Sequence, residues 1–134
     1  MSENLELVRS IFADWERGEL FTPAKWAHAD IECVMVDGPT PSTRTGLAGL
    51  EATTRELVGA YQDFSLTAQE YREIDERRVL VLVQFRGRTR TSGLELGQLA
   101  GRNASLLDIE RGAVSRLTLY WDRDRALADL GLAE

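Results

Sequence analysis

Two side chains in the first third of the chain could transfer a proton, Asp37 and His28. Asp37 ends an apolar run, and Gly38 and Pro39 follow it directly. A carboxylate held at the end of a strand can act as a general base, which accelerates reactions by roughly 10²–10⁴-fold. An aspartate before Gly-Pro is also typical of a residue that bonds its own backbone and starts a turn. The sequence therefore offers two interpretations of Asp37, a base at the rim of a pocket or the start of a turn.

His28 is the only histidine in the sequence, so it cannot belong to a histidine metal cluster, and no metal is expected. One interpretation makes it an acid–base partner of Asp37, because imidazole titrates nearest to neutral pH. The other places it at the end of a short helix predicted for residues 21–30, where a cation interacts favourably with the helix dipole. Cys33 is the only cysteine, which excludes an internal disulfide, and its apolar neighbours predict a buried thiol.

A second group of residues could line a pocket for a small hydrophobic molecule. Asn103 and Ser105 are two positions apart in a predicted strand, so both side chains face one side and could offer neutral hydrogen bonds. Trp121 ends the last predicted strand, where its ring would either stack on a ligand or form pocket wall. Phe12 and Trp15 lie on the apolar face of the first predicted helix and are candidates for the same wall. A pocket that these aromatic rings fill would favour a structural role instead.

Arg86, Arg88 and Arg90 alternate along one predicted strand and therefore share a face. Such a stripe either recognises an anion or pairs with acids on a neighbouring strand. A turn at residues 92–93 would place Arg90 opposite Glu95, which favours the structural interpretation.

The hydrophobic periodicity assigns these residues to elements of one α+β domain, residues 1–134. Helical periods, with Ser2 and Asp122 as N-caps, are found at residues 5–18, 21–30, 49–61 and 122–131. Strand patterns are found at residues 31–37, 64–74, 78–91, 94–109 and 113–121. Helices followed by a run of strands predict a curved antiparallel sheet wrapped around the N-terminal helices.

The composition excludes several classes of partner. The net charge of −6, without a basic stripe, argues against nucleic acid and against an anionic membrane surface. No apolar run approaches the ~20 residues that span a bilayer, and the N-terminus lacks the pattern of a signal peptide. A cytoplasmic location is therefore expected.

Five segments carry a family resemblance over nearly the whole chain. They are ADWERGEL, HADIEC, RTGLAGL, RVLVLVQFRGRTRTSGLELG and ERGAVSRLTLYWDRDRAL, in this order. Together they resemble the SnoaL-like members of the nuclear transport factor 2 superfamily, which includes ketosteroid isomerase, limonene epoxide hydrolase, scytalone dehydratase and polyketide cyclases. The resemblance implies a cone-shaped, cystatin-like α+β barrel with a deep apolar pocket, usually a homodimer through the sheet. It implies no single reaction, because this fold hosts many.

The resemblance also bears on individual residues. Asp37 falls where ketosteroid isomerase keeps its base, but Ile11 and Ser105 occupy the positions of its oxyanion-hole tyrosine and protonated aspartate. Leu119 stands where limonene epoxide hydrolase has an acid. The chain therefore lacks parts of both machineries.

Two functions remain open from the sequence. The first is a cofactor-free isomerase, cyclase, dehydratase or hydrolase, with Asp37 as base and Asn103 or Ser105 polarising an oxygen. The second is a non-catalytic ligand-binding or dimeric interaction module. An open cavity with a buried, partnered acid would favour the enzyme.

Overall fold

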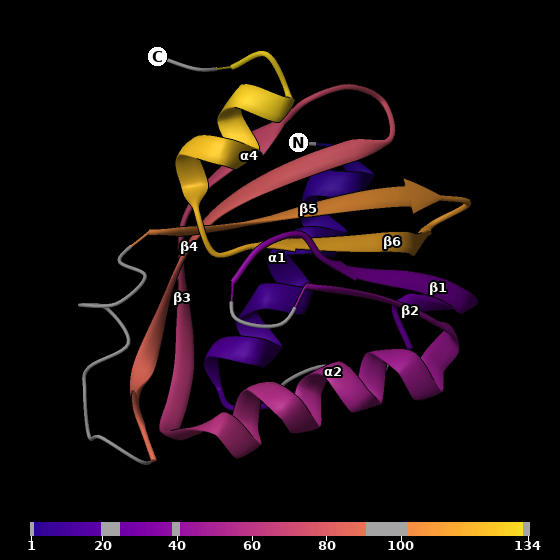
Figure 1. Ribbon diagram of the computed structural model, residues 1–134. Helices are drawn as coiled ribbons and strands as arrows, with labels where there is room; N and C mark the ends of the chain where they lie inside the picture. Colours follow the sequence, from indigo (N-terminus) through magenta and orange to yellow (C-terminus); the bar gives the residue numbers. More distant parts are fainter. Residues whose placement is uncertain (1, 20–24, 39–40, 91–101, 133–134) are drawn as a thin grey trace.

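The computed structural model describes residues 2–19, 25–38, 41–90 and 102–132 of the chain (Figure 1). Its elements follow one another as α1 (Glu3–Glu16), β1 (Ala27–Met35), β2 (Ser42–Thr45), α2 (Gly46–Ala60), β3 (Tyr61–Glu73), β4 (Arg78–Thr89), β5 (Asn103–Glu110), β6 (Ala113–Tyr120) and α4 (Arg123–Asp129). The predicted N-caps are confirmed: Ser2 accepts a hydrogen bond from the backbone of Leu5, and Asp122 accepts one from Asp124. No helix among these residues is long and apolar enough to cross a membrane, and the cytoplasmic location stays a prediction.

The strands form one sheet in the order β2-β1-β6-β5-β4-β3. Neighbouring strands are antiparallel except β1 and β6, which are parallel, with Cys33 opposite Leu117. The α+β class and the curved sheet around the helices are confirmed, but the prediction of a wholly antiparallel sheet is wrong at this pairing. The reason is that alternation identifies the buried face of a strand and says nothing about the direction of a distant partner.

Two further differences from the prediction lie before and after β1. The short helix predicted for residues 21–30 is wrong where the structure describes it, because β1 already begins at Ala27. The carbonyl of Trp26 accepts a hydrogen bond from Val114, so pairing with β6 overrides the local helical pattern. Residues 20–24 lie outside the described part. β2 has only four residues, mostly polar, and its sequence carried no strand signal.

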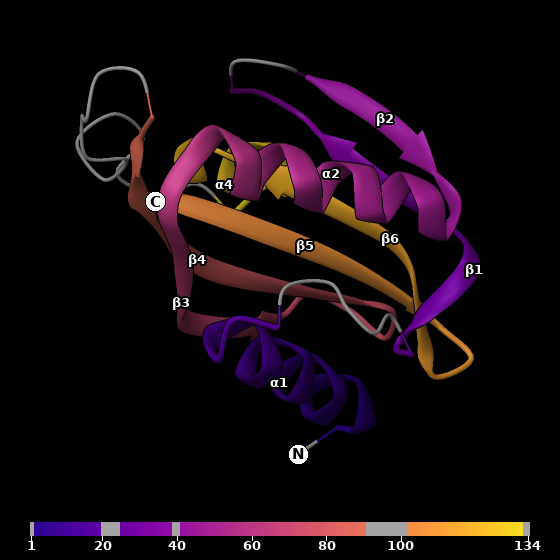
Figure 2. The ribbon, with the colours of Figure 1, turned by 90° about the horizontal axis from the view of Figure 1, so that it is seen from below.

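The inner face of the sheet is the face that α1 and α2 cover (Figure 2). Alternate positions of every long strand point into it, and they pack with the apolar stripes of both helices into one core. Val8, Phe12 and Trp15 come from α1, and Leu50 and Leu57 come from α2. A helix on this face must bury such a stripe to be stable, which is why the 3.6-residue period predicted both helices.

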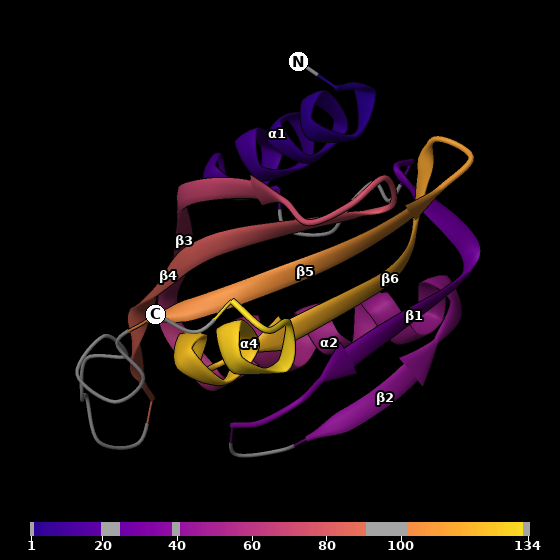
Figure 3. The same cartoon turned by 90° about the horizontal axis from the view of Figure 1, so that it is seen from above.

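The outer face is the opposite one, and α4 covers one end of it (Figure 3). Ala126 and Leu127 of α4 pack on a second apolar cluster formed by Leu80, Leu82, Ala104, Leu106 and Tyr120. The Tyr120 hydroxyl donates a hydrogen bond to Asp129. Burial is the larger cause and this bond the second of a rise in the pKa of Tyr120 to about 12. The short helix is therefore fixed to the sheet by apolar and polar contacts together.

Arg123 fastens the start of α4 to three strands. Its side chain is 7% exposed, and its guanidinium donates to the carbonyls of Asn103 and Val83 and to the side chain of Gln69, over 3.0, 2.9 and 2.6 Å. No ion pair of Arg123 is found among the described residues. Burial lowers the pKa of the Arg123 guanidinium, and its hydrogen bonds to three neutral oxygens offset part of the desolvation of its charge.

We expect Arg123→Met to destabilise the fold by roughly 2–3 kcal/mol, because the apolar replacement leaves buried carbonyl oxygens without their donor. Urea unfolding followed by circular dichroism would measure the change. Arg125→Met, two positions along the same helix, is the matched control. Arg125 is exposed, and its one ion pair within the described part of the chain is with Asp129, at 4.0 Å, so its loss should cost no more than about 0.5 kcal/mol. Equal effects of the two variants would contradict the role of Arg123.

Candidate functional site

Asp37 lies just beyond the end of β1, and its carboxylate connects β1 to the end of β6. One oxygen accepts the backbone N–H of Trp121 over 2.6 Å, and the other accepts that of Asp122 over 3.2 Å. The preceding N–H, that of Val36, donates to the Leu119 carbonyl over 3.1 Å. Asp37 therefore continues the parallel pairing of β1 and β6 with its side chain.

Asn103, at the start of β5, is fully buried, and both ends of its amide are bonded to backbone. Its oxygen accepts the N–H of Phe85 over 2.8 Å, and its nitrogen donates to the carbonyl of Trp121 over 3.0 Å. Ser105 shares the inner face, as alternation predicts, and lies between Val81 and Leu119 on the neighbouring strands. Of the two neutral groups, Asn103 already bridges β4 to the end of β6, so its amide is bound within the protein.

Trp121 belongs to an aromatic group that we call the aromatic end cluster, formed by Tyr61, Phe64, Phe85 and Trp121. The Trp121 ring centroid lies 5.2 Å from that of Phe85, edge to face, and 6.0 Å from that of Tyr61. Phe64 contacts both Tyr61 and Phe85, at 6.1 and 5.4 Å. Tyr61 and Trp121 are 9% and 8% exposed and Phe64 is half-buried, so this end of the core reaches the surface.

Phe12 and Trp15 belong to a different aromatic group, between α1 and the sheet. Their centroids are 4.5 Å apart, Tyr71 lies 6.1 Å from Phe12, and Trp26 lies 5.6 Å from Trp15. Both are buried to 1% exposure or less. The structure therefore places these two candidates in the core beneath α1, and the ring contacts of Trp121 are with the aromatic end cluster.

His28 lies near the start of β1, at the opposite end of this strand from Asp37. Its Nε2 donates to the carbonyl of Glu110 over 2.6 Å, which joins β1 to the hairpin between β5 and β6. His28 and Asp37 are nine positions apart along extended chain, a span of roughly 30 Å at ~3.3 Å per residue. The structure does not bring the two proposed catalytic side chains together, and the short helix that His28 was expected to cap is replaced by β1.

The remaining candidates have structural partners. Arg90 donates to the carbonyls of Gly59 and Val58 over 2.7 and 3.3 Å and so binds the last turn of α2, while Glu95 lies outside the described residues. Cys33 is buried as expected, and burial raises the pKa of its thiol, against a hydrogen bond with Thr53 that lowers it. No group of His, Cys, Asp and Glu within the described ranges could hold a metal ion.

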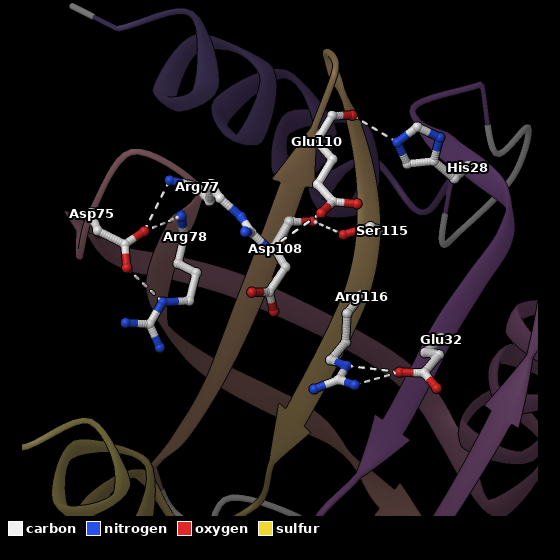
Figure 4. A network of polar contacts seen from close by, with 9 residues as sticks. All are labelled: His28, Glu32, Asp75, Arg77, Arg78, Asp108, Glu110, Ser115 and Arg116. Atoms are coloured by element: carbon white, nitrogen blue, oxygen red, sulfur yellow. Dashed lines mark hydrogen bonds and ion pairs between the residues drawn. The ribbon is translucent and has the colours of Figure 1, made fainter.

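A row of charged residues on the outer face was not among the candidates predicted from the sequence. Arg78, Asp108, Arg116 and Glu32 lie side by side on four adjacent strands, in alternating charge (Figure 4). Arg116 binds Glu32 through Nε over 2.9 Å, and Arg78 binds Asp75 over 2.8 Å. A hollow of about 1110 Å³ opens beside this row at the hairpin end of the sheet. The signal was present as single charges at the outward positions of otherwise apolar strands, but only the strand register brings them into one row.

Burial disfavours the charged form of Asp108, the carboxylate that β5 contributes to this row. Burial raises the pKa of Asp108, although Arg116, Arg78 and Arg77 each lower it. The desolvation of the carboxylate, together with repulsion from Asp75, therefore outweighs the attraction of the three arginines. By contrast, hydrogen bonds from the backbone of Arg77 and then the Arg78 side chain lower the pKa of the exposed Asp75.

We expect Asp108→Asn to become more stable relative to wild type as the pH rises from below 3.8, the usual value of this group, to neutral. The folded wild type binds the Asp108 proton more tightly than the unfolded chain does. The stability from that proton is full below the unfolded pKa and is lost as the pH rises through the raised folded pKa. Denaturant titrations at several pH values would measure this.

Asp75→Asn is the control of opposite sign. Its lowered pKa means that the wild-type carboxylate stabilises the fold above the unfolded pKa, and that this contribution is lost as the pH falls. The asparagine variant should therefore lose stability relative to wild type as the pH rises. The same trend in both variants would show that the two environments do not differ as described.

Comparisons with known proteins identify the fold. No protein-family model matches the sequence, and no curated protein matches it significantly. A nuclear transport factor 2-like protein of unknown function from Burkholderia pseudomallei superimposes with a TM-score of 0.74 at 19% identity, over 96% of this chain and 97% of that one.

Two other solved structures carry more specific descriptions. A protein with a ketosteroid isomerase-like fold from Catenulispora acidiphila, in complex with trimethylamine, gives a TM-score of 0.70 at 16% identity, over 95% of this chain and 93% of that one. A protein assigned as a SnoaL-like polyketide cyclase from Mesorhizobium loti gives 0.69 at 12% identity, over 90% of this chain and 99% of that one. The chain therefore has the nuclear transport factor 2-like fold, with ketosteroid isomerase-like and SnoaL-like proteins among its structural relatives.

Proposed function

We propose that this chain binds a small hydrophobic molecule at the aromatic end cluster, on the inner face of its sheet. The observation that carries the proposal is the exposure of this cluster. Phe64 is half-buried and Tyr61 and Trp121 are 9% and 8% exposed at the end of the core, with Phe85 buried behind them, whereas Phe12 and Trp15 are closed off beneath α1. Binding sites for small molecules are typically lined by apolar and aromatic side chains with few polar groups.

The polar candidates support binding over catalysis. The Asn103 amide and both Asp37 oxygens are engaged by backbone groups, and His28 lies at the other end of β1. Ile11 and Leu119 are core residues with no group that could exchange a proton. Recognition would therefore depend on shape and on contacts with the ring faces. An ammonium group is one chemistry such rings accept, and a structural relative was crystallised with trimethylamine.

A cofactor-free isomerase, cyclase, dehydratase or hydrolase with Asp37 as general base is the second candidate. The observation in its favour is that the Asp37 carboxylate is half-buried beside the Trp121 backbone, while the Ser105 hydroxyl remains on the inner face. Each carboxylate oxygen retains a second lone pair, which is what proton abstraction requires. Conversion of a bound compound to product would favour this candidate over binding alone.

Binding can be tested with ¹⁵N-labelled protein titrated with trimethylamine and with a panel of small uncharged ring compounds. We expect saturable shifts around Trp121, and Trp121→Ala should weaken binding roughly tenfold, because an aromatic contact contributes about 1 kcal/mol or more. Trp26→Ala is the matched control, since Trp26 belongs to the other aromatic group. Mass spectrometry of the same mixtures would detect turnover. Affinity that depends on Trp26 and not on Trp121 would place the ligand elsewhere.

We also propose a homodimer through the part of the outer face that α4 leaves uncovered. The long strands leave one broad face that α1 and α2 do not cover, and α4 covers one end of it (Figure 3). What remains includes the row from Arg78 to Glu32, whose alternating charges are complementary to those of a second, two-fold related copy.

Light scattering at tens of micromolar should then report twice the 15.0 kDa mass of one chain. Arg116→Glu should shift the protein towards monomer, because it breaks the alternation and removes the partner of Glu32. Arg55→Glu is the control, since Arg55 is an exposed arginine of α2 outside this face. A wild-type protein that scatters as a monomer would rule out the dimer.

A further inference from the structure

The backbone of Trp121 is held from both sides by side chains of other strands. Asp37 accepts its N–H over 2.6 Å, and Asn103 donates to its carbonyl over 3.0 Å. Asn103 is itself fixed, because its amide oxygen binds the Phe85 N–H and its backbone carbonyl accepts from Arg123. Phe85 is also the ring against which the Trp121 indole packs edge to face, at 5.2 Å. Both the peptide and the ring of Trp121 are therefore positioned against Phe85 of β4, the peptide through Asn103 and the ring by direct contact.

Gly38 fixes the indole itself. A Cβ atom at this position would lie 2.0 Å from Cδ1 of Trp121 and 2.3 Å from its Nε1, so the ring rests directly on the glycine backbone. Gly38 also has a φ of +89°, a conformation that side-chain-bearing residues rarely adopt. Two independent constraints therefore require glycine directly after Asp37.

We propose that Asp37 and Gly38 are the positioning residues for the Trp121 indole, and through it set the shape and selectivity of the ligand site; this rests on the proposed binding function. Asp37 does so as a hydrogen-bond acceptor for the Trp121 peptide, and Gly38 does so as the surface under the ring. The requirement at residue 37 is an acceptor oxygen in this place. Neither a charge nor a proton-accepting function is needed.

A positioning role and a general-base role of Asp37 predict different effects of the substitution Asp37→Asn. Asp37→Asn keeps an acceptor oxygen for the shorter of the two bonds, so it should preserve the position of Trp121 and most of the affinity. Asp37→Ala removes both bonds to the carboxylate and should release the Trp121 segment. If residue 37 were a base, asparagine would instead abolish turnover as completely as alanine.

The test uses the indole N–H signals of the full chain in ¹⁵N-labelled protein. The chain has three tryptophans, and Trp121→Phe identifies the signal of Trp121. We expect Asp37→Ala to shift or broaden this signal without ligand and to weaken trimethylamine or ring-compound binding roughly tenfold. Asp37→Asn should stay close to wild type in both respects. Asp75→Ala is the matched control, since Asp75 also accepts two backbone N–H groups, over 2.9 Å each, at the other end of the sheet.

Gly38→Ala acts on the indole ring directly and covers the case in which Asp37→Ala does not fold. It should displace the Trp121 signal while leaving the Asp37 carboxylate in the chain. An unchanged Trp121 signal in folded Asp37→Ala or Gly38→Ala overturns the inference, whatever happens to binding. A displaced signal in protein whose wild type binds none of the probes supports the positioning role and counts against the proposed function alone.

Discussion

The parallel pairing of β1 with β6 is the constraint on which the rest of this structure depends. A parallel pair needs a long connection, and here it contains β2, α2 and three further strands. Of these elements, β2 pairs with the outer edge of β1, α2 crosses the inner face, and β3, β4 and β5 extend the sheet on the far side of β6. The sheet therefore curves around α1 and α2. The same pairing places Asp37, at the end of β1, next to Trp121, at the end of β6. The geometry of the candidate site is therefore a consequence of strand order.

The cost of burying polar groups explains what became of the residues that suggested catalysis. A buried amide or guanidinium without partners costs several kcal/mol, so such groups in a core are bonded. Asn103 and Arg123 meet this requirement with backbone oxygens and N–H groups at the ends of strands, where the ladder is incomplete. Their bonds give the end of the sheet a fixed shape, and the aromatic end cluster is built on it. In this protein the polar residues near the site form its support, and the apolar rings form its surface.

On the outer face, the cost of burying polar groups separates an apolar part, which α4 covers, from a charged part. The charged row that begins at Arg78 lies next to two rows of mostly apolar side chains. One of these rows contains Leu80 and the other contains Leu82, each with its cross-strand neighbours. Because α4 has only seven residues, it covers the apolar rows and stops short of the charged one. Asp108 thus lies half-buried at the boundary, close enough to the covered part to lose solvation and still among arginines. A surface of this kind is suited to a partner of complementary charge.

The sequence by itself determined the class of fold, most of its elements and which face of each is buried. The periods at residues 5–18 and 49–61 correspond to α1 and α2, and the alternation of the last predicted strand puts Leu117, Leu119 and Trp121 on one face, which is the inner one. These properties follow from contacts between residues close in the chain and from the burial of apolar surface, both of which leave a periodic record.

Only the tertiary structure decided the direction of β1 against β6, the strand that replaced the helix expected at residues 21–30, and the partners of Asp37 and His28. Each depends on hydrogen bonds between residues more than 80 positions apart. The chemistry of a carboxylate depends on which donors surround it, and donors that distant are not encoded in the residues beside it. The sequence around Asp37 shows a local turn pattern, whereas its backbone donors, Trp121 and Asp122, directly follow β6 near the other end of the chain.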